Sequence, residues 1–301
     1  MTAYSEVVQV LRDPLFIPAL VGAQEAAEIL ETQSAVDDRR TQMKSVAGEI
    51  MVRLDRALPG LLSRAMMNFD GNREYDFLTE ILKPWCIAVA ACGVGDRADA
   101  RCGTLAESIF AASAFPYNPD LQKAARSAVA ELNERLGPEN VLAVQTFVAL
   151  SASLPVFLGT AWALLLSHPD QWRLLQQDPT LAPLVIEECL RFSGLPRIQF
   201  RQAACDVVLG GMEIRQKQNV LLMIQLANKD PAVFPDPNSF DITRTNNPHL
   251  SFGRGGHSCV GAHIVRSIGR ALTVHLTSVI KTAELRETPR WKGVAMRFLE
   301  T

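Results

Sequence analysis

A cysteine, Cys259, lies in the glycine-rich stretch SFGRGGHSCVGAH, directly before a segment with helical periodicity. A thiol in such a loop can serve as a nucleophile, a zinc ligand or an axial ligand of haem iron. A nucleophile needs a base directed at it, and His257, two residues away, is poorly placed for that role. The spacing of His257, Cys259 and His263 is not usual for zinc. Glycines allow a backbone to approach a flat macrocycle, and the start of the following helix favours a thiolate, so these residue types also suit an axial ligand.

The bulk composition excludes several classes of protein. The 301 residues are 48% hydrophobic and 21% charged, with a formal net charge of −2. This balance is typical of a globular protein and predicts neither a nucleic-acid nor a membrane-surface partner. The first residues show no basic segment followed by an apolar run, so we expect no secretory signal and a cytoplasmic location. Reduced thiols are therefore expected for the other, scattered cysteines, which are Cys86, Cys92, Cys102, Cys189 and Cys205.

The ten residues from Phe252 to Gly261, FGRGGHSCVG, match the haem-binding signature of the cytochrome P-450 family at every defining position. This resemblance implies a shortened cytochrome P-450 fold, mostly α with a small β portion, and haem b as the cofactor. It implies that Cys259 is the iron ligand and that Phe252 shields its sulfur. Gly253, Gly255 and Gly261 would then let the backbone approach the haem.

Two upstream segments extend the resemblance. Glu188 and Arg191, in ECLR, resemble the family's Glu-x-x-Arg helix, and Arg244, in FDITR, resembles the third member of its ion-pair cluster. The resemblance implies a buried structural cluster that pins the long segment beneath the haem. The alternative is a surface pair on one helix, worth a few tenths of a kcal/mol.

The propionates of haem need hydrogen-bond donors or cations as partners. The resemblance assigns this role to Arg201, in FRQAACD, and to His257, and it places Arg40, in DDRRTQMKS, at a third basic position. For Arg40 and the nearby Lys44, an exposed basic face is the alternative interpretation.

The oxygen-binding side departs from the family pattern. The family's central helix carries an acid–alcohol pair, and counting back from the HPD motif places Ala152 and Ser153 there. An alanine side chain cannot relay a proton, so Ser153 and the neighbouring Ser151 are the catalytic candidates. Pro155 has no N–H and should leave the Ser151 carbonyl without its helical donor, opening a groove for oxygen or an ordered water. A plain proline kink is the alternative.

The elements that must position these residues are mostly helical. Periodicity predicts helices over residues 4–11, 46–62, 75–94, 106–115, 120–136 and 181–192. Turns are expected at Asp13-Pro14 and Pro59-Gly60, and Pro169 should end one helix and open the next. The pattern predicts a hairpin and a strand over residues 206–224. It predicts a long proline-rich connection over residues 228–247. The simplest organisation is a single haem-binding domain over residues 1–301.

One apolar segment, residues 141–166, is long enough to span a bilayer. Polar residues inside it, such as Gln145 and Thr146, and the lack of a flanking basic cluster favour a helix through the core instead. A membrane span is the alternative.

The resemblance covers almost the whole chain, but in a shortened form. YSEVVQVLRDP resembles a segment well inside a typical member, and residues 95–139 are short for the two helices that cover the substrate pocket. A more exposed haem, a large or carrier-bound substrate, or a homo-oligomer that completes the roof would each fit this shortening.

Three functions follow as hypotheses. The first is a monooxygenase that oxidises a small, secondary-metabolite-like molecule with O₂. Its electrons would come from a ferredoxin and its reductase, because the chain lacks a Gly-rich nucleotide motif. The second is an atypical enzyme that uses peroxide, substrate-assisted proton delivery or non-oxygenating chemistry, because the acid position is Ala152. The third is a non-enzymatic helper derived from the family, against which the intact cysteine loop argues.

Overall fold

The computed structural model describes residues 1–18, 33–65, 74–95, 98–115, 118–137, 142–280, 283, 285, 290–292 and 298–300. Within these ranges the chain is mostly helical with a small β portion, as predicted. The helices are α1 (Tyr4–Arg12), α2 (Gln33–Ala65), α3 (Lys83–Val94), α4 (Ala100–Ala114), α5 (Pro119–Leu136), α6 (Ala143–Val148), α7 (Leu154–Ser167), α8 (Pro169–Gln177), α9 (Ala182–Ser193), α10 (Ile224–Ala227) and α11 (Ala262–Val279). Shorter helical turns are η2 (Phe77–Leu82), η3 (Ala149–Ser153), η4 (Pro179–Leu181) and η5 (Gly255–His257).

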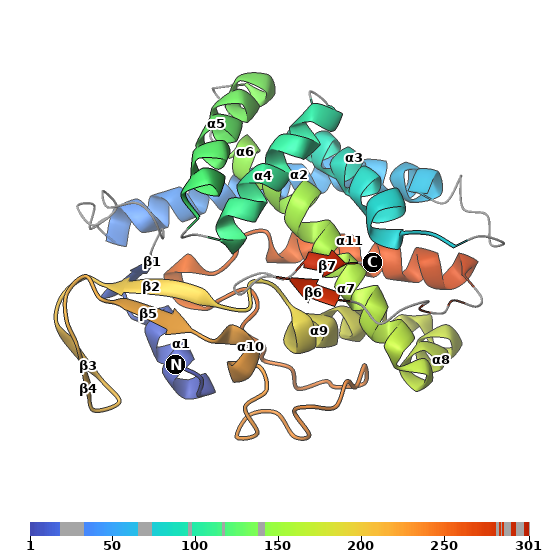
Figure 1. Cartoon of the computed structure of the whole chain (residues 1–301). Helices are drawn as coiled ribbons and strands as arrows, with labels where there is room; N and C mark the ends of the chain where they lie inside the picture. Colours follow the sequence, from blue (N-terminus) through green and yellow to red (C-terminus); the bar gives the residue numbers. More distant parts are fainter. Residues whose placement is uncertain are drawn as a thin grey trace.

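The helices and the sheet occupy different parts of the molecule (Figure 1). Helices α3, α4 and α5 lie on one side of the run formed by α6, η3 and α7, and the sheet with α1 and α10 lies on the other. The larger apolar core packs the helices around α7, and a smaller core joins α1 to the sheet. The site residues come from the region where these two parts meet.

The small β portion contains short strands. Strands β1 (Phe16–Pro18), β2 (Gln199–Ala203) and β5 (Asn219–Leu222) form one antiparallel sheet in the order β1-β2-β5. Strands β3 (Val207–Leu209) and β4 (Met212–Ile214) form the predicted hairpin, and β6 (Arg290–Lys292) pairs with β7 (Phe298–Glu300). The sequence did not predict β1 and β2, because they are short and carry no clear alternation of polar and apolar residues.

The predicted turn at Pro59-Gly60 was wrong, because α2 continues through Pro59 to Ala65. Leu54, Leu58 and Leu61 are buried at helical spacing and hold this segment against the core. Pro59 and Gly60 face outward, so the carbonyl that loses its donor to proline remains accessible to water.

The long apolar segment is a core helix, as predicted, although Val141 at its expected start lies outside the described residues. Ala143–Ser167 is apolar and long enough to cross a membrane, as is Phe77–Val94. The first of these is 78% buried inside the protein, which favours the core interpretation. Pro169 then begins α8 directly after His168, as expected.

The opening predicted from Pro155 is present as a π turn, η3. The Leu154 N–H donates to the Ala149 carbonyl, five residues back, rather than to Leu150. Pro155 has no N–H to offer Ser151. The carbonyls of Leu150 and Ser151 therefore lose the donors that a regular α-helix would supply, and the helix widens at this point.

Candidate functional site

The cysteine loop, defined as residues 249–261, is held in a tight turn before α11. The Cys259 N–H donates to the Phe252 carbonyl at 2.8 Å, and the Gly253 N–H donates to the Leu250 carbonyl at 2.8 Å. Gly253 has φ = +69°, a conformation that L side chains rarely adopt. A Cβ at Gly261 would lie 3.9 Å from the Cys259 sulfur. Glycine therefore serves the turn at 253 and leaves open space beside the sulfur at 261.

Cys259 lines a cavity of about 570 Å³, a size typical of ligand pockets. Its walls come from α2, α6, η3, the cysteine loop and the start of α11, and they are largely apolar. The apolar lining includes Met43, Val46, Ile50, Leu150, Ile264 and Val265. A larger open groove of about 930 Å³ lies among α2, α3 and α4, but none of the predicted site residues lines it.

Burial raises the pKa of the Cys259 thiol above its usual range. The N–H groups of Gly261 and Ala262 and the positive charges of Arg266 and Arg40 act in the opposite direction. The loop alone therefore does not produce a stable thiolate. A bound metal ion would supply the missing charge, because coordination deprotonates a thiol.

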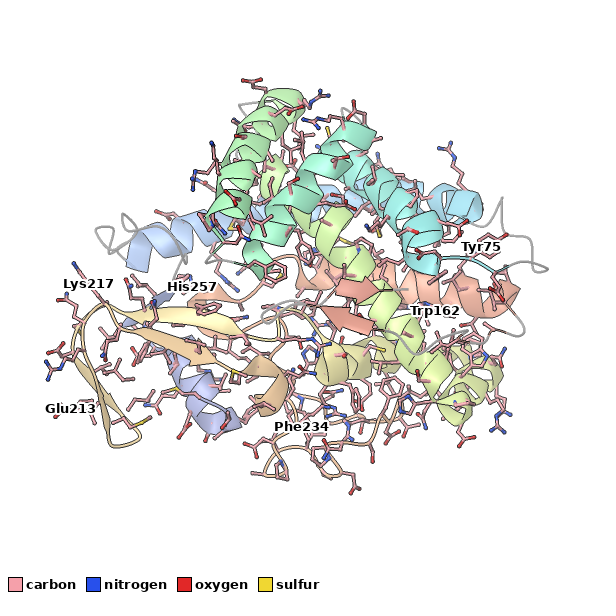
Figure 2. The ribbon with its side chains drawn as sticks, in the orientation of Figure 1. Tyr75, Trp162, Glu213, Lys217, Phe234 and His257 are labelled. Carbon is pink, nitrogen blue, oxygen red and sulfur yellow. The ribbon has the colours of Figure 1, made fainter. Side chains whose placement is uncertain are left out.

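The predicted cations lie around the cysteine loop in different ways. Arg40 and His257 both line the cavity, and Figure 2 shows His257 where the helical part meets the sheet. The Arg40 guanidinium donates to the Gly256 carbonyl at 2.8 Å, the Ser258 carbonyl at 3.0 Å and the Ser258 hydroxyl at 2.6 Å. Arg40 therefore braces the loop beside the cavity, which the alternative of an exposed basic face did not anticipate.

Arg201 is buried on β2, opposite Val220 and Pro18 in the sheet, and Pro18 lines the cavity. Its guanidinium donates to the Phe200 carbonyl at 2.9 Å and to the Gln199 side chain at 3.2 Å. Its Nε has no hydrogen-bond partner among the described residues. Burial lowers the pKa of Arg201 from its usual value. A buried cation with a free donor suits an anionic group such as a carboxylate.

The structure separates the predicted residues of the oxygen side. Ser151 is buried and its hydroxyl donates to the Phe147 carbonyl at 2.7 Å. Ser153 is half-buried, and the described lining of the cavity includes neither serine. Ala152 is 4% exposed and belongs to the main apolar core. An acid at position 152 would therefore sit among apolar side chains, where its charge is costly.

Sequence reasoning missed the polar side chains of the central helix that do line the cavity. Gln145 and Thr146 lie there with Leu142 and Ala149. The spacing of these residues by three and four places them on one face of the helical run that contains α6 and the start of η3. That periodicity was the available signal, but the apolar composition of the segment directed attention to its burial instead.

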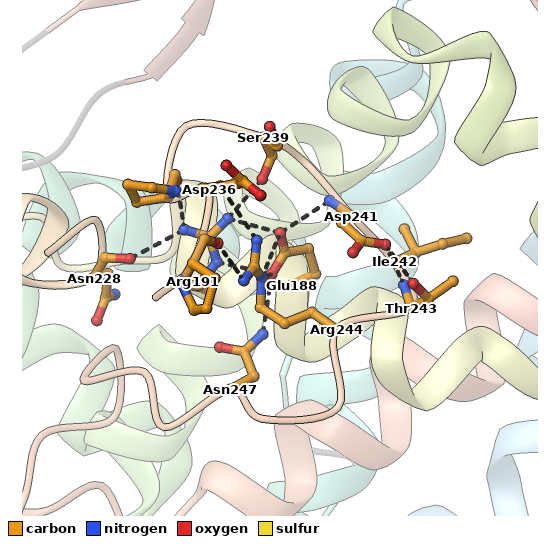
Figure 3. Close-up of polar contacts among 12 residues, drawn as sticks. Glu188, Arg191, Asn228, Asp236, Ser239, Asp241, Ile242, Thr243, Arg244 and Asn247 are labelled. Carbon is orange, nitrogen blue, oxygen red and sulfur yellow. Dashed lines mark hydrogen bonds and ion pairs between the residues drawn. The ribbon is translucent and has the colours of Figure 1, made fainter. Parts of the chain in front are cut away.

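The Glu188 cluster has the predicted members (Figure 3), and the side chains of Glu188 and Arg191 are fully buried while that of Arg244 is nearly so. Arg191 binds Glu188 with two hydrogen bonds of 2.8 and 2.7 Å, and Arg244 lies 3.3 Å from the same carboxylate. Both arginines also donate to carbonyls of the 228–247 connection, including those of Asn228, Pro235, Pro237 and Ser239. Asn247, which the sequence did not indicate, donates to Glu188 at 3.1 Å. The surface-pair alternative is therefore wrong.

The fold requires glycine at position 255 whether or not a ligand is bound. Gly255 has φ = +73°, and an added Cβ would lie 2.6 Å from the Leu11 carbonyl and 3.0 Å from the Arg12 Cα of α1. The end of α1 thus packs directly on the cysteine loop.

Replacing Gly255 by alanine is expected to lower the free energy of unfolding more than replacing Gly211 does. Both positions have positive φ, but a Cβ at Gly211 has nothing within 4 Å. Each substitution costs about 1–2 kcal/mol for the backbone conformation, and Gly255→Ala adds about 1–3 kcal/mol for the clash. Urea unfolding of both variants measures the difference, and equal losses would contradict the close packing of α1.

The residues around Cys259 fit haem b. The cavity offers apolar walls for a macrocycle, a thiol that faces it, and open space beside the sulfur at Gly261. Arg40 and His257 line it. Arg201, whose Nε has no hydrogen-bond partner among the described residues, pairs in the sheet with Pro18 of the cavity wall. These hydrogen-bond donors match the two carboxylates of the macrocycle.

Comparison with known proteins agrees with this fit. The family model for cytochrome P-450 matches residues 168–287. The biotin biosynthesis cytochrome P-450 of Bacillus subtilis is 44% identical over 102 residues, 34% of this chain and 26% of that protein. The 6-deoxyerythronolide B hydroxylase of Saccharopolyspora erythraea is 44% identical over 112 residues, 37% of this chain and 28% of that protein. The alignments thus cover little more than a quarter of the length of these two relatives.

The fold comparison extends over the whole chain. The crystal structure of P450BioI in complex with hexadec-9Z-enoic acid ligated acyl carrier protein aligns with a TM-score of 0.87 and 22% identity, covering 100% of this chain and 90% of that one. Haem b is the cofactor of the matched family. The chain is therefore similar to the cytochrome P-450 family over residues 168–287, and it shares the fold of a solved cytochrome P-450 structure.

Proposed function

We propose that this chain is a haem-thiolate monooxygenase that oxidises a small organic molecule, either free or attached to a carrier protein. The observation that carries the proposal is the position of Cys259 on an apolar cavity that is also lined by residues of α2 and α6. Among the relatives, one is named a hydroxylase and another, the nocardicin C N-oxygenase of Nocardia uniformis, an N-oxygenase. A carrier-bound substrate is suggested by the acyl carrier protein in the structure with the same fold.

In this proposal Cys259 would ligate the haem iron, and Arg201, His257 and Arg40 would hold its carboxylates. Phe252 and Gly253 shape the loop that carries the sulfur. A thiolate-ligated haem supplies activation of O₂ for transfer of an oxygen atom to the substrate, since the thiolate favours O–O cleavage. The apolar side chains of α2 and α11 exclude water from the cavity. Electrons come from a ferredoxin-type protein in the cytoplasm, and residues 1–301 act as one haem-binding domain.

Proton supply depends on hydroxyl groups, because position 152 is an alanine in the apolar core. The Ser151 hydroxyl is engaged with the Phe147 carbonyl. This leaves Ser153 Oγ, beside the widened turn η3, and Thr146 Oγ1, on the cavity wall, as the groups that hold and pass a proton through ordered water. The amide of Gln145 is placed to orient a polar group of the substrate.

Replacing Ser153 by alanine, or Thr146 by valine, is expected to uncouple turnover. Reductant is then consumed with release of hydrogen peroxide. The amount of product formed per reductant falls by roughly a hundredfold, the lower end of the effect expected for loss of one proton-transfer group. The control is Thr160→Val, because the buried Thr160 hydroxyl only donates to the Val156 carbonyl of its own helix. Unchanged coupling in both Ser153→Ala and Thr146→Val would remove these hydroxyls from the proton path.

The test of the proposed function begins with the absorption spectrum of the reduced, carbon-monoxide-bound protein. A red-shifted Soret band indicates thiolate ligation, and the absence of bound haem would overturn the proposal. A panel of free and carrier-linked compounds can then be screened by the substrate-induced shift of the same band. Activity with peroxide but not with reductant and O₂ would favour the second candidate, a peroxide-driven enzyme, for which the buried Ala152 is the supporting observation.

A further inference from the structure

A second charged cluster is formed by Glu187, Arg266 and His249. Glu187 directly precedes Glu188 in the sequence, but the two carboxylates have different partners. Glu187, on α9, accepts two hydrogen bonds from Arg266, on α11, at 2.6 and 2.8 Å. Its Oε2 atom also lies 3.1 Å from His249 Nε2, at the start of the cysteine loop. The carboxylate of α9 therefore meets both the cysteine loop and α11, which lie 62 and 79 residues further along the chain.

The contacts of His249 fix its tautomer. The Ser251 N–H donates to His249 Nδ1 at 3.2 Å, so Nδ1 is the unprotonated nitrogen. The proton is then on Nε2, which donates to Glu187. The side chain of His249 is 2% exposed, that of Glu187 25% and that of Arg266 43%. The cluster thus runs from the interior to the surface.

Glu187 remains ionised in this setting. Burial raises the pKa of its carboxyl, but the hydrogen bonds from Arg266 and His249 outweigh burial and bring the pKa to about 2. At neutral pH the cluster therefore contains one anion facing one permanent cation.

Phe252 connects this cluster to the cysteine. The Arg266 guanidinium lies over the Phe252 ring, 4.7 Å from its centroid, and the His249 ring lies 5.9 Å from the same centroid. The Phe252 carbonyl accepts the Cys259 N–H at 2.8 Å. A displacement of Phe252 would therefore move the peptide that carries the ligand sulfur.

We propose that Glu187, Arg266 and His249 form a clamp that positions Phe252 and, through its carbonyl, Cys259. In this clamp Arg266 has two separable roles, because its planar fork holds Glu187 and its charge contributes positive potential at the sulfur. Glu187 orients the fork and balances part of its charge. All three are positioning residues. The inference rests on the proposed haem-thiolate function, since the clamp acts on the ligand of that haem.

The two roles predict different signs in one measurement. Glu187→Gln removes an anion near the thiolate, so the reduction potential of the haem should rise. Arg266→Gln removes a cation, so the potential should fall. Arg266→Lys keeps the charge but loses the planar fork, so its potential should stay near that of the parent. A purely structural role would move Glu187→Gln and Arg266→Gln in the same direction.

The positioning role predicts a common effect in a second measurement. The carbon-monoxide complex of the thiolate-ligated form should convert to a form without thiolate roughly tenfold faster in all three variants, a factor that corresponds to one charge-assisted hydrogen bond. The matched control is Arg270→Gln, one turn later on α11, where the side chain is exposed. Equal conversion rates in Arg266→Lys, Glu187→Gln and the control, or potential shifts of the same sign in the two glutamine variants, would overturn the proposal.

Hydrogen exchange of the Cys259 amide in the haem-free chain separates this inference from the proposed function. Exchange should be faster in Glu187→Gln and Arg266→Gln than in Arg270→Gln, because the Phe252 carbonyl is no longer fixed. Absence of haem from the parent chain would end the proposed function, whereas unchanged amide exchange would end the clamp.

Discussion

Replacing Cys259 by serine is expected to remove the red-shifted Soret band of the reduced, carbon-monoxide-bound protein completely and to reduce substrate oxidation below detection. Among the described residues, Cys259 is the cysteine that lines the apolar cavity. A serine hydroxyl does not supply the electron density by which a thiolate favours O–O cleavage. The hydroxyl is close in size to the thiol, so the cysteine loop should keep its turn at Gly253 and the protein its fold.

The control for this substitution is Cys205→Ser, since Cys205 is a half-buried free thiol outside the cavity lining. This variant should keep the spectrum of the parent. Circular dichroism and the urea midpoint of both variants show whether the fold is retained. A thiolate-type spectrum in Cys259→Ser would assign the iron ligand to another cysteine and refute the site described here.

The second large effect is expected on stability. Replacing Arg191 by alanine should lower the free energy of unfolding by about 3–5 kcal/mol, because it leaves Glu188 buried with only part of its compensation. It also removes the donor from three backbone carbonyls, those of Asn228, Pro237 and Ser239. Since folded proteins are stable by about 5–15 kcal/mol, this loss approaches the whole margin.

Two further variants keep this prediction measurable by urea unfolding. Arg191→Lys retains the charge but not the planar fork, so it should fold and show an intermediate loss. Arg173→Ala is the control, because Arg173 pairs with Asp170 on the surface of α8, where an ion pair contributes about 0–1 kcal/mol. A loss for Arg191→Ala no larger than that for Arg173→Ala would contradict the structural role of the cluster.

Local patterns in the sequence predicted the parts of this molecule that depend on neighbouring residues. The cysteine loop, the helix that follows it and the helix of Glu188 and Arg191 were all readable, because their signals lie within a few residues. The opening at Pro155 was also predictable, since the missing N–H is a property of proline itself. The direction of Ala152 into the core was not, because it depends on what α3 and α4 place around η3.

Contacts between distant segments could not be predicted from the sequence. Glu187 and Arg266 are 79 residues apart, and nothing in either segment indicates the other. Gly255 was assigned to the approach of a haem, but its close neighbour is Leu11 of α1. Pro59 was read as a turn because proline disfavours helices, yet the burial of Leu54, Leu58 and Leu61 outweighs that preference.

The packing of α1 on Gly255 has a consequence for the order of events in folding. Strand β1 pairs with β2, and the end of α1 contacts the cysteine loop across more than 240 residues of chain. Such contacts form late, because the entropy of closing a long loop is lost before the contact stabilises it. A ribosome that adds about 5–20 residues per second will therefore release most of the helical body before this corner can close. Haem should be acquired at or after that last step. A shortage of haem during synthesis should then leave a chain whose helices are formed but whose α1 and cysteine loop are still apart.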